Sequence, residues 1–177
     1  VNAALTGHLV LSTLHTNSAA GTVPRLLDMK VEPFLLVSTV NVVIAQRLVR
    51  RLCSVREAYI LSKQELDRLS GHADLDRVLA LLKTEKVVKP TDTWQSIQFY
   101  RPKASSDCAE GYSGRSVVSE VLPITRPIRD LVMRNSTSEE IESQAKKEDM
   151  LTLVEDGIFQ AARGITSIEE VFRVANE

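Results

Sequence analysis

The stretch ALTGHLVLSTLHTNSAAGT, residues 4–22, decides the fold class. Its central run, His8–Leu14, is short, apolar and uncharged, which is typical of a strand buried on both faces of a parallel sheet. Asn17 or Ser18 can then cap a helix that continues through Leu27. Because Pro24 is tolerated only near a first helical turn, this helix is expected to be short or to begin late. A buried strand followed by a helix predicts an α/β fold.

Two histidines, His8 and His15, bracket the predicted strand. They are seven residues apart, about 23 Å along a straight strand at about 3.3 Å per residue, so both cannot contact one small group. Ligands bind at the carboxyl ends of the strands in parallel α/β sheets, which makes His15 the better candidate. The alternative is a structural histidine at a turn. His8 is expected to orient local structure or to contact a neighbouring subunit.

The composition excludes several classes of protein. Lysine and arginine number 22 and aspartate and glutamate 23, so the net charge of -1 gives no reason to expect nucleic acid as a partner. No apolar run reaches the roughly 18 residues of a membrane span. Two distant cysteines do not make a disulfide framework, and a reducing compartment is the default expectation. Since the chain begins with valine and has no signal peptide, we expect a fragment of a longer protein.

The remainder of the chain reads mainly as helices. The run from Pro33 to Leu52 predicts one long apolar helix with a cationic end, and a strand over Val37–Val43 is the alternative. Ser62 and Glu65 form a capping-box pattern at the start of a short helix. Further strands are expected at 97–100 and 116–124, and further helices at 74–85, 127–135, 138–147, 150–163 and 167–175.

Four stretches in order resemble one known family. LTGHLVLSTLHTNSA resembles the histidine box of the secretion ATPases that drive type II secretion and type IV pilus assembly. FLLVSTVNVVIAQRLVRRLC resembles the helix that follows this box. GYSGRSVVSEVLPI and LVEDGIFQAARGITSIEEVFRV resemble the closing segments of the family. Because the likeness covers nearly the whole chain, the chain is identified as a member, although these motifs do not separate secretion motors from pilus-assembly motors.

The resemblance implies the C-terminal part of a homo-hexameric motor that uses ATP and Mg²⁺ and has a RecA-like P-loop ATPase core. Residues 1–52 would be the end of that core with its histidine box, 53–115 a small inserted subdomain with a degenerate zinc motif, and 116–177 a mainly helical subdomain. The motor would assemble pilins or pseudopilins with an inner-membrane platform protein, and so be cytoplasmic and peripheral at the inner membrane.

The resemblance also predicts what this chain does not do alone. In the family, the phosphate loop, an acidic box and the Walker B segment precede the histidine box, and the sequence G-x-x-x-x-G-K-[ST] does not occur in these 177 residues. We therefore expect no ATP hydrolysis by the chain alone, because the backbone cradle and the lysine that hold the nucleotide are missing. The alternative function is a non-catalytic oligomerisation or docking module.

The likeness assigns roles to a few side chains. His15 would lie near the terminal phosphate of ATP, where an imidazole can donate a hydrogen bond and report whether that phosphate is present. Thr13 flanks His15 as a hydroxyl that could assist nucleotide binding, and His8 is the third candidate contact. For Thr13, β-propensity is an equally good explanation.

The two cysteines stand where many family members have CxxC pairs. Only Cys53 remains of the first pair and only Cys108 of the second. Structural zinc sites need four ligands, and the spacing of His72 gives no support for a third, so we predict no bound zinc and two buried or half-buried thiols. Packing by Trp94, Phe99 and Tyr100 would then replace the metal. Separately, Lys30 stands where the family often has glycine, and a left-handed conformation there would cost about 1 kcal/mol.

Overall fold

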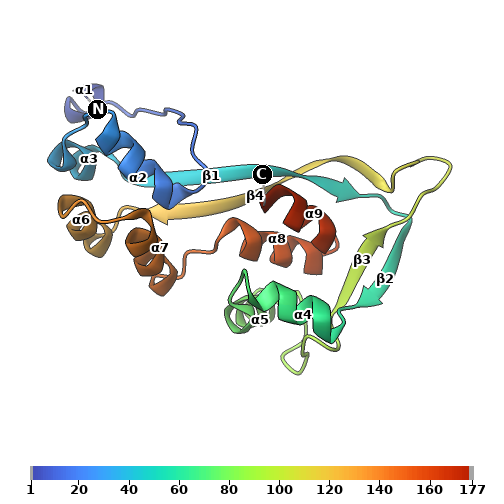
Figure 1. The fold of residues 1–177 in the computed structure, drawn as a ribbon. Coiled ribbons are helices and arrows are strands. Elements are labelled where there is room, and N and C mark those ends of the chain that lie inside the picture. The colour runs from blue at the N-terminus through green and yellow to red at the C-terminus, as the bar shows by residue number, and fades with distance from the viewer. Residues whose placement is uncertain (1, 176–177) are drawn as a thin grey trace. The chain divides into compact units, whose positions relative to one another are not determined.

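The computed structural model describes residues 2–175 and contains both helices and strands, in agreement with the predicted α/β class (Figure 1). In chain order the elements are α1 (Asn2–Leu5), α2 (Ala19–Asp28), α3 (Pro33–Thr39), β1 (Val42–Leu52), β2 (Arg56–Ile60), α4 (Lys63–Ser70), α5 (Leu75–Thr84), β3 (Gln98–Pro102), β4 (Tyr112–Pro123), α6 (Arg126–Met133), α7 (Ser138–Lys147), α8 (Leu153–Ala162) and α9 (Ile168–Ala175). β1 pairs with β4, and β2 pairs with β3 in an antiparallel register that sets Arg56 opposite Pro102.

The chain forms two compact units. Unit 1 comprises residues 1–45 and 119–151, and unit 2 comprises residues 46–118 and 152–177. Two of the three boundaries therefore fall inside β1 and inside β4, and the third lies between α7 and α8. The predicted division into a core part, residues 1–52, an inserted subdomain, 53–115, and a helical subdomain, 116–177, stays a prediction.

Unit 1 packs helices α2, α3, α6 and α7 around the C-terminal end of β4. Its fully buried side chains include Val23 from α2, Leu36 from α3, Leu122 from β4 and Ile128 from α6. Burying aliphatic side chains of this size contributes roughly 1.5–3 kcal/mol each. This core therefore holds α2, which directly follows the histidine box.

Unit 2 packs α4, α5, α8 and α9 against the antiparallel pair β2–β3. Phe99 of β3 is fully buried, and the Trp94 ring stacks on it with centroids 6.3 Å apart. Tyr100 lies under the Arg56 guanidinium, 4.1 Å from the ring centroid. The predicted aromatic packing of this segment is thus present.

The prediction of a strand over His8–Leu14 is wrong for this chain. The residues between α1 and α2 form an extended loop without regular structure, blue in Figure 1. Leu9 and Leu11 are 91% and 90% exposed. A strand buried on both faces needs neighbours on both sides, and the part of the chain that the structure describes supplies none to this segment.

The prediction of one helix from Pro33 to Leu52 is also wrong. Proline does occupy the first turn of α3, as expected, but the helix ends at Thr39 and β1 begins at Val42. Burial alternates along β1, as it does in a strand with one covered face. The length of the apolar run favoured a helix. The β-branched residues Val42–Ile44 and the pairing with β4 favour a strand here and outweigh it. The arginines assigned to a helix end therefore lie on a strand.

Local signals predicted the other helices well. Ser62 and Glu65 form the expected capping box of α4, and Ser18 caps α2 by accepting a hydrogen bond from the Gly21 N–H. The expectation of a short or late α2 is wrong, because the helix begins at Ala19 and includes Pro24. Lys30, which stands where the family often has glycine, is left-handed, with φ of 65°.

Candidate functional site

The candidate site is the loop from His8 to the start of α2, all of it in unit 1. The structure sets His8 and His15 at opposite ends of this loop and does not bring them together. Thr13 and His15 are both exposed, and neither side chain bonds to another of the described residues. An exposed imidazole and an exposed hydroxyl two residues apart are free to meet a ligand.

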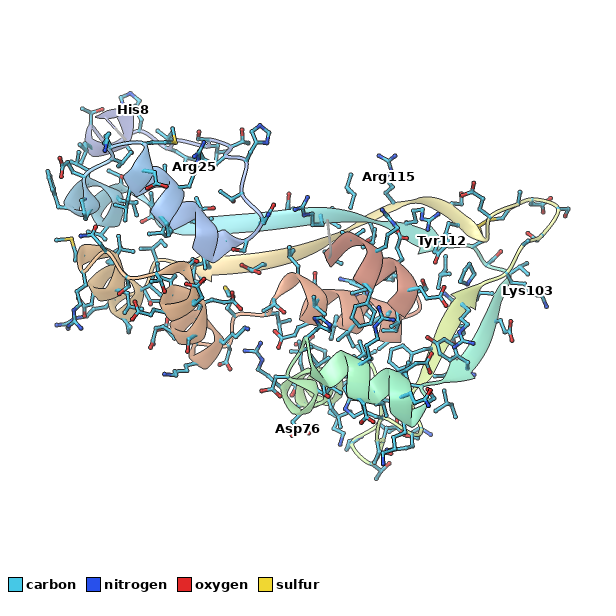
Figure 2. All side chains as sticks on the ribbon, in the orientation of Figure 1. His8, Arg25, Asp76, Lys103, Tyr112 and Arg115 are labelled. Atoms are coloured by element: carbon cyan, nitrogen blue, oxygen red, sulfur yellow. A yellow bond between two sulfur atoms is a disulfide. The ribbon has the colours of Figure 1, made fainter. Side chains whose placement is uncertain are left out.

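His8 follows α1 after a short turn, at the start of the loop (Figure 2). Its Nδ1 is 3.0 Å from the Thr6 hydroxyl oxygen, and its backbone N–H donates to the carbonyl oxygen of Ala3. These contacts agree with the expectation that His8 orients local structure. The assignment of His8 to nucleotide binding stays a prediction.

The segment after His15 is held by hydroxyl groups. The Thr16 hydroxyl lies 3.0 Å from the Thr22 hydroxyl and donates to the carbonyl oxygen of Ser18 at 3.2 Å. The Ser18 side chain caps the first turn of α2. His15 is therefore an exposed residue directly before a segment that hydrogen bonds hold in place.

Glu120 holds this helix start from a distant part of the sequence. Its carboxylate is only 4% exposed, and its Oε1 accepts the backbone N–H of Ala19 at 2.8 Å, across a separation of 101 residues. A carboxylate at a helix N-terminus is stabilised by both the hydrogen bond and the helix dipole. The histidine box is thus tied to strand β4. The sequence carries a signal for this residue, because Glu120 is in phase with the buried Val118 and Leu122 of β4.

A second polar cluster lies in unit 2 around Glu170 of α9. The side chain of Glu170 is fully buried and accepts hydrogen bonds from the Arg50 backbone N–H, the Arg50 guanidinium and the Arg173 guanidinium. Burial alone would raise the pKa of Glu170, but the hydrogen bonds from Arg173 and Arg50 outweigh it and lower the pKa to about 2. Arg50 also lies 4.3 Å from the centre of the Tyr112 ring, and this tyrosine hydroxyl contacts Ser167. Sequence reasoning missed this cluster, which fastens β1 to α9.

The cysteines correct another prediction. Cys53 and Cys108 are not two thiols but form a disulfide with Cα atoms 6.7 Å apart. The bond joins the end of β1 to the connection between β3 and β4, next to a hydrogen bond from the Cys53 N–H to the Gly111 carbonyl. Disulfide sulfurs are not thiolates, so these residues do not fit a thiolate zinc site. Across residues 2–175, no group of three or more His, Cys, Asp or Glu side chains is arranged to hold a metal ion.

Comparison with known proteins decides the family. Residues 1–173 match the family described as Type II/IV secretion system protein. The chain belongs to this family. It is 45% identical over its whole length to a Type II secretion system protein E of Xanthomonas campestris, and 40% identical over its whole length to the Type IV pilus assembly ATPase PilB of Pseudomonas aeruginosa. It is 35% identical to the Type II secretion system ATPase E of Vibrio cholerae.

This secretion-family chain spans only a part of those relatives. It covers 28% of the length of the Xanthomonas and Pseudomonas proteins and 31% of the Vibrio protein. The match of residues 1–173 to the family confirms the predicted membership in the family of secretion and pilus-assembly ATPases. Among the described residues, no helix is both long enough and apolar enough to cross a membrane.

Proposed function

We propose that this chain is the C-terminal part of a RecA-like P-loop ATPase that assembles pilins or pseudopilins. The observation that supports this best is the similarity of the whole of this chain to a part of a PilB ATPase and of a secretion protein E, together with an exposed His15 beside an ordered helix start. Residues 1–52 would complete the ATPase core, 53–115 would form the inserted subdomain, and 116–177 the helical one.

Within this proposal, His15 donates a hydrogen bond from its imidazole to the terminal phosphate of bound ATP. The Thr13 hydroxyl lies two residues away and can donate to the same anion or orient a water. Mg²⁺ would neutralise charge on the phosphate oxygens when bound. Glu120 and Ser18 fix the start of α2, and so limit how far His15 and the turn that precedes the helix can move. His8, bound to Thr6, would keep the entry to the loop in place.

The assembly belongs to the same proposal. The complete protein would act as a homo-hexamer on the cytoplasmic side of the inner membrane, attached there through a platform protein of the secretion or pilus machinery. The exposed Leu9 and Leu11 support packing against further protein in such an assembly, since exposed leucines of this kind mark interaction surfaces when they cluster. The same exposed leucines would suit the alternative function, a non-catalytic docking module.

ATP turnover by the complete protein tests the proposal. We expect the coding sequence before Val1 to encode a phosphate loop, and His15→Ala in the complete protein to lower kcat by roughly 10²-fold or more, as loss of a charge-stabilising donor does. His8→Ala is the control and should change kcat much less. A complete protein without a phosphate loop and without ATP turnover would refute the proposal and favour the docking module. Equal effects of the two substitutions on kcat would refute the role assigned to His15. The chain alone should show no turnover.

A further inference from the structure

Unit 2 carries a hollow of about 680 Å³ beside the turn that follows α5. Three lysines line it, namely Lys83 at the end of α5, Lys86 in the turn and Lys89 in the connection to β3. Within residues 2–175, none of these three ammonium groups forms an ion pair. The volume lies in the range of about 300–1,000 Å³ that is typical of ligand sites.

The charge of the hollow differs from that of the chain. Its lining contains three lysines and one carboxylate, Asp92, which leaves a net charge of +2, whereas the whole chain carries -1. The Asp92 carboxylate is already engaged, because it accepts the Lys89 backbone N–H at 2.7 Å and the Ser96 hydroxyl at 3.1 Å. The ammonium groups of the three lysines therefore have no carboxylate as an ion-pair partner among the described residues.

Part of the lining between the lysines is apolar. Val87, Val88 and Ile97 contribute to it, and all three also pack in the core of unit 2. The turn is closed by a hydrogen bond from the Val87 N–H to the Leu82 carbonyl at 2.9 Å, with Lys86 left-handed at φ of 56°. A ligand would thus meet a preformed surface and would not have to order a loop.

We propose that this hollow is a docking site for an acidic peptide segment that carries an apolar side chain, presented by a partner protein. The apolar side chain would occupy the valine and isoleucine lining, and flanking carboxylates would meet the lysines at the rim. A membrane fits less well, because membrane-binding faces insert protruding apolar side chains between their cations and here the apolar groups are recessed. The proposal does not depend on nucleotide chemistry.

Fluorescence anisotropy with a defined probe tests the proposal. The probe is a labelled peptide Glu-Leu-Glu-Glu-Leu-Glu, titrated with the full chain at low salt. Lys83→Gln/Lys89→Gln removes two rim charges and leaves the strained Lys86 unchanged. Lys63→Gln/Lys103→Gln is the matched control, with two exposed lysines of the same unit that do not line the hollow; Figure 2 marks Lys103 in the β3–β4 connection.

We expect saturable binding that the Lys83/Lys89 variant weakens on the order of tenfold, at roughly threefold for each exposed ion pair, and that the control variant leaves within twofold. A peptide with serine in place of leucine should also bind more weakly. Absence of saturable binding, or an equal loss in both variants, would overturn the proposal. Lysine-dependent sedimentation with phosphatidylglycerol vesicles, without binding of the peptide, would assign the hollow to a membrane and overturn it as well.

Discussion

Reduction of the Cys53–Cys108 disulfide should destabilise unit 2 by about 4 kcal/mol. The bond closes a loop with a sequence separation of 55 residues. In the chain-entropy treatment, cross-linking a loop of this length removes on the order of 14 cal/mol/K from the unfolded ensemble, which is about 4 kcal/mol at 25 °C. The folded unit keeps the hydrogen bond between the Cys53 N–H and the Gly111 carbonyl, so most of the effect arises in the unfolded chain.

The assay is urea unfolding followed by tryptophan fluorescence, with and without a phosphine reductant. Trp94 is the only tryptophan of the chain, is 8% exposed and lies in the same unit as both cysteines, so its emission reports unfolding of unit 2. With an m-value of about 2 kcal/mol/M, a loss of 4 kcal/mol moves the midpoint by about 2 M. The reduced chain should also show the larger m-value, because its unfolded state is more expanded.

The variant Cys53→Ser/Cys108→Ser serves as the control. It should unfold at the midpoint of the reduced wild type, and reductant should not shift it. A thiol assay on the unreduced chain should find no free cysteine. Equal midpoints for the reduced and unreduced wild type, or two reactive thiols before reduction, would refute the reasoning, because the bond would then not constrain the unfolded chain.

Three further predictions concern single side chains. The pKa of Glu170 is lowered from 4.5 to about 2, so the carboxylate stabilises unit 2 above pH 4.5 and this contribution, on the order of 3 kcal/mol, is lost as the pH falls toward 2. Glu170→Gln should remove that part of the pH dependence measured by Trp94 fluorescence, and an unchanged pH profile would contradict it. Glu120→Gln should speed hydrogen exchange of the Ala19 amide about fivefold, because a charged acceptor is roughly twice as strong as a neutral one; equal exchange would mean that Glu120 does not hold α2. Lys30→Gly should raise the stability of unit 1 by about 1 kcal/mol in thermal unfolding followed by circular dichroism, whereas Asp28→Gly, inside α2, should lower it.

The sequence predicts those parts of the fold that depend on neighbouring residues. The capping boxes at Ser62 and Thr137 begin α4 and α7 as their patterns indicate, since each uses contacts three residues apart. The segments 8–14 and 42–52 were predicted wrongly because their structure depends on distant partners. β1 forms because β4 pairs with it, and the loop before His15 stays unpaired because the described residues offer it no strand.

In the candidate site, too, the sequence predicts what depends on neighbouring residues and not what depends on distant partners. His15 was found from its position after an apolar run and from a resemblance, and the structure adds that it is exposed beside an ordered helix. Glu120 was not found, although the alternation of β4 indicates it, because Val118, Glu120 and Leu122 are all buried. A charge in a buried phase must be satisfied by a specific donor, since an unpaired buried carboxylate is costly. Here the donor is the first amide of α2. A charged residue in phase with the buried residues of a strand therefore predicts a distant donor that pairs with it. In this chain that donor is the start of the helix that follows the histidine box.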